Sequence, residues 1–205
     1  LPACRRSEIA ARMDTIDALA AAYALKDERR TGWQLRGVTD PESVAAHAWG
    51  VTLLCLQYGD AAGVDVDRAL RLAVVHDIAE AETGDVATRA NDDRQRVDAE
   101  AKARHERAAM DDLAAPLDDT VRALWEEYEA RETSAAQFVK DMDLVDMCLQ
   151  ALVYEREDRY AGDDGEAFEE YDDLDEFFAT VEPRLRTEVG ETLFAEIRRR
   201  YEDAK

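Results

Sequence analysis

The segment LRLAVVHDIAEAETGDV, residues 70–86, leads from an apolar helical stretch into the dipeptide His76-Asp77 and then into a Thr-Gly-Asp turn. The chain has only three histidines, at positions 47, 76 and 105. The first two lie on apolar-flanked segments with carboxylates nearby, and imidazole together with carboxylate is a ligand set for divalent cations of borderline hardness. The segment therefore predicts metal-assisted chemistry at a helix end.

Helical spacing continues along most of the chain, and strand-like alternation is nearly absent. We expect helices over residues 7–26, 41–58, 65–81, 91–113, 118–130 and 134–160, followed by two acidic helices divided near Pro183. The expected helix caps are Ser7, Asp40 (followed by Pro41 at the first helical position), Asp65 or Asp67, Asp118 and Thr133.

The expected breaks between helices are a loop over residues 27–40 and a turn at Gly162–Gly165. The acidic stretch 163–176 is expected to be a solvated face. Because we find no internal repeat and no long linker, the sequence predicts one all-α domain, 1–205, in which acidic helices of residues 166–205 pack on the rest.

The charge balance is strongly acidic. The chain carries 48 Asp and Glu against 26 Lys and Arg, a formal net charge of -22, and only four of the basic residues are lysines. This pattern favours adaptation to molar salt, where a Debye length of about 3 Å tolerates a self-repelling surface. The alternative is an ordinary acidic protein. In either case the surface repels nucleic-acid phosphates, so we expect no nucleic-acid partner.

Three cysteines without a CxxC pair indicate neither a disulfide framework nor a thiolate zinc site. The first residues, LPACRRSEIAARMD, lack an apolar signal-peptide core. No run of residues is long and apolar enough to span a membrane. We therefore expect a soluble cytoplasmic protein with no membrane partner.

Around His76-Asp77, helical spacing places Glu80 close to both residues of the pair. A cation over the edge of the helix would then touch one residue and lie near the others. Taken alone, each histidine also fits a buried residue that hydrogen bonds to its neighbours. For His47, in PESVAAHAWGVTLL, that ordinary core position is the more frequent case.

A third polar group lies far downstream, in FVKDMDLVDMCLQALVYERE, residues 138–157. Asp141, Asp143 and Asp146 interrupt an otherwise apolar helix, and buried carboxylates are costly unless a partner such as a metal ion compensates them. Asp143 and Asp146 share a face, and Lys140 joins that face. We expect Asp141 or Asp143 to point to water.

The order H…HD…D resembles that of the HD-domain metal-dependent phosphohydrolase superfamily. Three segments resemble the signature segments of its 5'-deoxynucleotidase branch: RTGWQLRGVTDPESVAAHAW (30–49), HDIAEAETGDV (76–86) and VKDMDLVDMCLQALVYE (139–155). The resemblance covers roughly residues 30–160. It implies an HD-domain helical bundle and one divalent cation, with Mn, Co, Mg, Fe, Ni and Zn all open because a His/Asp set suits several metals.

The resemblance also implies a role for each matching residue. The implied metal ligands are His47, His76, Asp77 and Asp143, with Glu80 as the acid/base residue. The implied substrate-binding residues are Arg30, Trp33, Arg36, Asp85 and Thr88. Either arginine is expected to hold the phosphate, and Trp33 either to stack on the base or to anchor its loop. The chain departs from the family in lacking a proline between Asp85 and Thr88, and in having Gly37 where a polar residue is common.

The function that the resemblance implies is hydrolysis of nucleoside 5'-monophosphates to nucleoside and phosphate. It also implies a homodimer, for which the first helix and the apolar positions Leu193, Phe194 and Ile197 are candidates. One alternative is another HD-type hydrolase, acting on nucleoside triphosphates, alarmones or cyclic nucleotides. A second is a non-catalytic metal-binding helical module, which predicts the loss of a ligand or of Glu80; none of these residues is missing.

Overall fold

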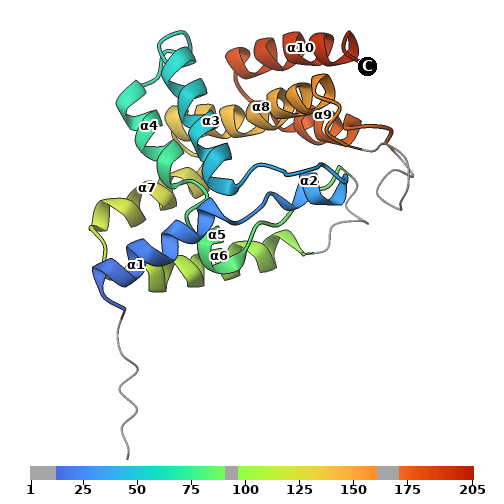
Figure 1. Ribbon diagram of the computed structural model, residues 1–205. Coiled ribbons are helices and arrows are strands. Elements are labelled where there is room, and N and C mark those ends of the chain that lie inside the picture. The colour runs from blue at the N-terminus through green and yellow to red at the C-terminus, as the bar shows by residue number, and fades with distance from the viewer. Residues whose placement is uncertain (1–12, 91–96, 161–170) are drawn as a thin grey trace, which may run out of the picture.

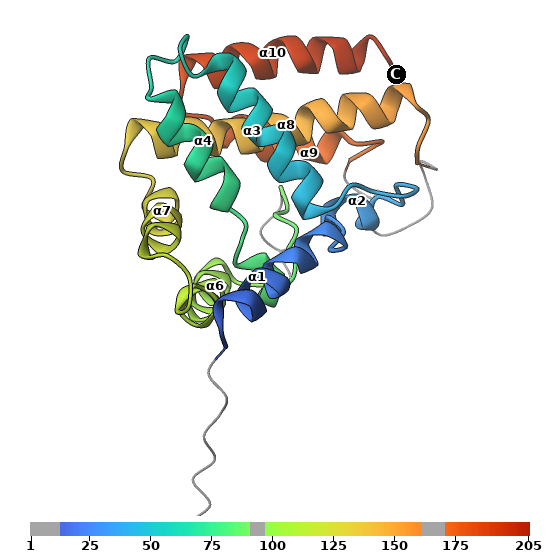
Figure 2. The ribbon, with the colours of Figure 1, turned by 60° about the vertical axis from the view of Figure 1, so that its left-hand side comes forward.

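The computed structural model describes residues 13–90, 97–160 and 171–205, and within these ranges the chain forms helices and no strand (Figure 1). The all-α prediction is confirmed. The longest helix, α8 (Ser134–Arg156), is the centre of the packing. It contacts α3 (Val44–Tyr58), α4 (Val66–Val75), α7 (Asp119–Ala130), α9 (Asp175–Val181) and α10 (Glu188–Glu202). Figure 2 shows α8 passing behind α3 and α4, with α10 above them.

Acidic and hydroxyl side chains start the long helices by accepting backbone N–H groups of the first turn. These caps are Asp14, Ser43, Asp65, Asp98, Asp118, Thr133 and Thr187. The predicted caps Asp65, Asp118 and Thr133 are confirmed. Ser7 lies outside the described residues, within which the first helix is α1 (Thr15–Ala22), extended by the 3₁₀ turn η1 (Tyr23–Lys26).

The predicted start of the second helix is wrong. Helix α3 begins at Val44 behind the Ser43 cap, whereas Asp40 has a φ of 48°, in the left-handed region, and does not cap it. The predicted loop before it contains a short helix, α2 (Thr31–Leu35).

The predicted helix over 65–81 is interrupted at the dipeptide that defines the site. Helix α4 ends at Val75, and α5 (Glu80–Thr83) follows after a turn. In this turn the N–H of Ile78 donates to the carbonyl of Val75, and that of Glu80 to Asp77, so the chain is wound more tightly than an α-helix. His76 and Asp77 therefore lie in the turn itself.

The later helices agree with the sequence in number but differ at their ends. Helix α6 (Ala99–Ala114) follows the Asp98 cap, α8 ends at Arg156 rather than near Tyr160, and the 3₁₀ turn η4 (Glu182–Arg184) contains Pro183. The turn expected at Gly162–Gly165 lies outside the described residues. None of the helices in the described ranges has both the length and the apolar character needed to cross a bilayer.

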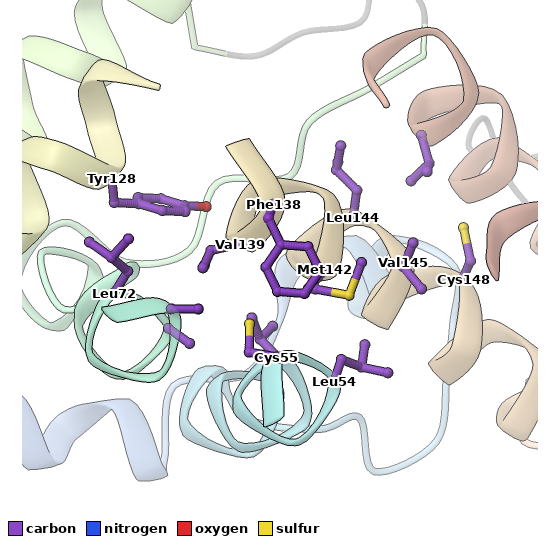
Figure 3. Close-up of a cluster of buried hydrophobic side chains, with 14 of the residues drawn as sticks. Leu54, Cys55, Leu72, Tyr128, Phe138, Val139, Met142, Leu144, Val145 and Cys148 are labelled. Atoms are coloured by element: carbon purple, nitrogen blue, oxygen red, sulfur yellow. The ribbon is translucent and has the colours of Figure 1, made fainter. Parts of the chain in front are cut away.

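The core lies where α8 meets α3 and α4. Figure 3 shows Phe138 and Met142 of α8 pointing toward Leu54 and Cys55 of α3, with Leu72 of α4 beside them. In α10, Phe194 and Ile197 are buried in the same core and are not free for the dimer contact considered above. Because α8 is buried along most of its length, its three aspartates are held inside the protein.

Candidate active site

Four polar side chains converge from three parts of the chain: His47 from α3, His76 and Asp77 from the α4–α5 turn, and Asp143 from α8. The Nε2 atoms of the two histidines are 3.4 Å apart. Asp143 Oδ1 lies 3.1 Å from Nε2 of His47, and Asp77 Oδ2 lies 3.1 Å from Nε2 of His76. The structure thus brings together the four residues expected as metal ligands.

The other ring nitrogen of each histidine faces a hydrogen-bond acceptor. Nδ1 of His76 donates to the carbonyl oxygen of Ala73 at 2.8 Å, and Nδ1 of His47 faces Asp146 Oδ2 at 2.7 Å. Because these partners only accept, a neutral ring carries its proton on Nδ1 and its lone pair on Nε2. Two imidazole lone pairs and two carboxylates then face one another, an arrangement that needs positive charge between them.

Without a cation, a second proton on the ring of His47 supplies this positive charge. Burial and the Arg30 guanidinium lower the pKa of His47, but hydrogen bonds to Asp143 and Asp146 outweigh them and raise it to about 10. Burial alone would raise the pKa of Asp143, yet Lys140 and His47 hold it well below its usual range. Donor atoms of His47, His76 and Asp143 lie within 4.8 Å of one another. This donor set fits a divalent cation.

Glu80 opens the short helix α5 beside these residues and is only 4% exposed. Its Oε1 lies 3.4 Å from Nζ of Lys102, and its Oε2 has no hydrogen-bond partner within the described ranges. Burial, and then the charges of Asp77 and Asp85, raise its pKa well above the usual value. A carboxyl group held in this way is suited to giving and taking a proton.

A cavity of about 160 Å³ opens beside Asp77 and Asp143, and neither His47 nor His76 is among the residues that line it. The sequence-predicted site residues that line it are Arg30, Trp33, Asp77, Glu80, Asp85, Thr88 and Asp143. Lys102, Lys140 and Arg184 add positive charge to its wall, and Leu144, Met147 and Phe177 make an apolar part. The cavity wall therefore combines four basic and four acidic side chains with an apolar surface.

Arg30 is fixed in this wall by two carboxylates. Its Nη1 lies 3.3 Å from Asp77 Oδ2 and 3.4 Å from Asp85 Oδ1. Although burial lowers the pKa of Arg30, Asp85 and Asp77 raise it overall, so the guanidinium stays charged. Asp85 itself is held by the backbone N–H of Thr31, which donates to its Oδ2 at 2.6 Å.

Trp33 anchors its loop, as one of the two expectations from sequence had it, and it also lines the cavity. It lines the cavity, and its ring packs 3.9 Å from that of Phe177, centroid to centroid. Its Nε1–H also donates to Glu42 Oε1 at 3.0 Å, which anchors α2.

Arg36, by contrast, is not brought to the main cavity. Its Nη2 donates to Glu176 Oε2 at 2.5 Å, and its Nη1 donates to the carbonyl of Tyr171. Glu176 is itself buried against this arginine, so the expected solvated acidic face does not include it.

The expectation that Asp141 or Asp143 points to water is wrong, because all three aspartates of α8 are buried. Asp141 accepts the backbone N–H groups of Arg186 and Thr187, at 3.0 and 2.7 Å from its Oδ2. It joins α8 to the start of α10. Asp146 Oδ2 faces Nδ1 of His47, and Asp143 Oδ1 faces Nε2 of the same ring.

The sequence placed Lys140 on the face of Asp143 without giving it a role, and it missed Lys102 and Tyr128 at this site. Lys102 and Lys140 are two of the chain's only four lysines, and both line the cavity. The rarity of lysine in this chain was the sequence signal that could have pointed to them. Nζ of Lys140 lies 2.7 Å from Asp143 Oδ2. The hydroxyl of Tyr128 donates to the same oxygen at 2.8 Å, and no sequence pattern marked it.

Comparison with known proteins agrees with this geometry. A family model described as HD domain matches residues 22–188. The 5'-deoxynucleotidase HDDC2 of Xenopus laevis is 41% identical over 142 residues, which are 67% of this chain and 68% of that protein. The protein of the same name from Danio rerio is 36% identical over 165 residues, covering 78% of this chain and 74% of its own.

Among solved structures, the PH0347 protein of Pyrococcus horikoshii OT3 superposes with a TM-score of 0.70 at 29% identity. The match covers 93% of this chain and 99% of that one. The family match extends over most of the chain and includes all four converging residues. The chain therefore belongs to the HD domain family, and within it the chain is similar to the 5'-deoxynucleotidases.

Proposed function

We propose that this protein is a metal-dependent phosphomonoesterase that hydrolyses ribo- and deoxyribonucleoside 5'-monophosphates to nucleoside and phosphate. The observation that carries this proposal is the pair of Nε2 atoms, 3.4 Å apart and flanked by two carboxylates, beside a cavity whose wall carries basic side chains. The similarity to 5'-deoxynucleotidases supports the same substrate class.

In this proposal His47, His76, Asp77 and Asp143 hold one divalent cation. When bound, the cation supplies Lewis acidity, which makes water acidic near neutral pH and offsets charge on the phosphoryl oxygens. Lys102 and Lys140, which line the cavity beside Glu80 and Asp143, attract the dianionic phosphate. Arg30 presents N–H donors at the same wall.

Glu80 is the general acid or base of the proposed reaction. The oxygen of water forms a bond to phosphorus while the bond from phosphorus to the 5'-oxygen breaks. Glu80 takes a proton from the attacking water or gives one to the leaving 5'-oxygen. Its Oε2, which has no hydrogen-bond partner among the described residues, is the atom available for this transfer.

The remainder of the cavity suits the nucleoside. Phe177 and Trp33 provide an aromatic wall for the base or the sugar. Asp85 and Thr88 supply polar groups within reach of sugar hydroxyls in the same cavity.

Phosphate release from a panel of ribo- and deoxyribonucleoside monophosphates, with Mn²⁺, Co²⁺, Mg²⁺ or no metal in high salt, tests the proposal. We expect release only with a cation and only from monophosphates. Turnover of a triphosphate or cyclic nucleotide, with no release from any monophosphate, would overturn it. The same panel identifies the preferred metal, because the His/Asp set suits several.

We further propose that the protein is a single-domain, cytoplasmic, salt-adapted homodimer. The charge of -22 supports the salt adaptation. Exposed apolar side chains on α3, namely Trp49, Leu53 and Leu56, support self-association. Analytical ultracentrifugation in molar KCl tests the dimer, and a single monomer species over a wide range of protein concentration would contradict it.

A further inference from the structure

Asp146 is a buried carboxylate that the proposed reaction leaves unused. It lies three residues after Asp143 on α8 and is only 7% exposed. Its Oδ2 lies 2.7 Å from Nδ1 of His47, whose side chain is fully buried. Asp143 and Asp146 therefore contact opposite nitrogens of one imidazole ring.

The neighbouring helix is shaped to admit this carboxylate. Gly50 lies three residues after His47 in α3, and a Cβ atom there would be 2.2 Å from Asp146 Oδ1 and 3.0 Å from its Cγ. Glycine inside a helix costs about 1 kcal/mol relative to alanine. Within α3 no positive φ requires it, so the close approach of Asp146 is the structural reason for this residue.

The two histidines differ in what holds them. His76 donates to the neutral carbonyl of Ala73, whereas His47 faces a carboxylate. A charge-assisted hydrogen bond is stronger than a neutral one, and it makes the opposite ring nitrogen a better electron donor. His47 is accordingly the more strongly oriented of the two rings.

We propose that Asp146 is a positioning residue, which fixes His47 in the Nδ1–H tautomer and aims its Nε2 at the cation, and that Gly50 makes room for it. This inference rests on the cation site proposed above. Asp146 itself touches neither the cation nor the substrate.

The test uses Asp146→Asn in the full chain, with Asp141→Asn as the matched control. Asp141 is also a buried aspartate of α8, but its carboxylate contacts the start of α10 and no histidine. Two readouts are needed: Zn²⁺ affinity by competition titration, and the Nδ1–H resonances of zinc-loaded protein labelled with ¹⁵N-histidine. The chain has only three histidines, so His76 serves as an internal reference.

For Asp146→Asn we expect Zn²⁺ affinity to fall about 10- to 100-fold, the range found when a partner of a metal-bound histidine is removed. The His47 Nδ1–H signal should move upfield while that of His76 stays in place. Gly50→Ala should weaken binding as well, although Asp146 is still present, because the added methyl displaces the carboxylate. Asp146→Glu, which keeps the charge, should recover part of the affinity and of the downfield signal.

An Asp146→Asn affinity close to that of the wild type would overturn the inference, as would an unmoved His47 signal. An equal loss in Asp141→Asn would also overturn it, because the effect would then be general destabilisation. If the proposed cation site is itself wrong, the wild-type chain binds no Zn²⁺ at His47 and its spectrum does not change on adding metal. That outcome differs from the one that would overturn the Asp146 inference alone, in which wild type and Asp146→Asn both bind Zn²⁺ with the same affinity.

Discussion

Glu80 differs from the other carboxyl groups of the cavity because one of its oxygens has no partner among the described residues. Replacing it by the isosteric Gln keeps the shape and removes the ability to exchange a proton. We expect Glu80→Gln to lower kcat by about 10²- to 10⁴-fold. Cation affinity should change little, because the carboxylates beside the two Nε2 atoms are those of Asp77 and Asp143, not that of Glu80.

Steady-state kinetics together with a metal titration checks this prediction. Glu82→Gln is the control, because Glu82 lies in the same short helix and is exposed. A wild-type kcat in the Glu80→Gln variant would show that Glu80 takes no part in the proton transfer.

Asp141 and Asp143 are two residues apart, but the structure gives them different functions. Asp143→Asn should abolish cation binding, because its carboxylate faces His47 Nε2. Asp141→Asn should leave cation binding intact and lower the free energy of unfolding by about 1–3 kcal/mol, the cost of leaving buried donors without an acceptor. The donors at risk are the N–H groups of Arg186 and Thr187.

Metal titration and urea unfolding of the two variants separate these effects. The assignment would be reversed if Asp141→Asn lost the cation while Asp143→Asn kept it.

At the scale of whole elements, α9 is held against the loop that follows α5 by a buried ion pair. Glu176 accepts from Nη2 of Arg36 at 2.5 Å and from Nε of Arg89 at 2.6 Å. Burial would raise the pKa of Glu176, but Arg89 and Arg36 hold it below its usual value. The next residue, Phe177, lines the cavity, so this contact positions part of the nucleoside wall.

Glu176→Gln should therefore lower the free energy of unfolding by about 3 kcal/mol, a typical cost of breaking a buried ion pair. Because the pKa is lower in the folded state, the stabilisation is complete above the unfolded pKa of about 4.3 and is lost as the pH falls through the folded value. The stability gap between wild type and variant should thus be large at neutral pH and shrink in acid.

Urea unfolding at a series of pH values measures this gap. Glu182→Gln, which removes an exposed pair with Arg198, is the control and should change stability by less than about 1 kcal/mol. A gap that is the same in acid and at neutral pH would contradict the ion-pair interpretation.

The elements also show which parts of the site local sequence can predict. The helices carrying His47 and Asp143 were predictable from apolar periodicity, and the Thr133 cap of α8 was predictable as well, whereas the Ser43 cap of α3 was missed. The break after Val75 was not predicted, because the apolar helical pattern continues through it to Ala81. The role of Asp141 depends on residues 45 positions away. Arg30 and Arg36, which the sequence left as equal candidates for the phosphate, are separated only once α2 forms between them.

At the scale of the molecule, the chain is strongly acidic, but the cavity wall carries as many basic side chains as carboxylates. Arg30, Lys102, Lys140 and Arg184 gather there, in a chain of net charge -22. Substrate anions are therefore repelled at long range and attracted only close to the site. Salt screens the repulsion between exposed charges more than the interaction between buried ones.

The same screening should govern stability, because self-repulsion of the acidic surface opposes the compact state. The Debye length falls from about 10 Å at 0.1 M salt to about 3 Å at 1 M. We expect the melting temperature to rise steadily as KCl is increased over this range, and to rise much less in sucrose, which stabilises by exclusion but does not screen charge. Thermal unfolding followed by circular dichroism provides the measurement. A melting temperature that is flat or falls with KCl would mean that the charge of -22 does not limit stability, and the proposal of salt adaptation would fail with it.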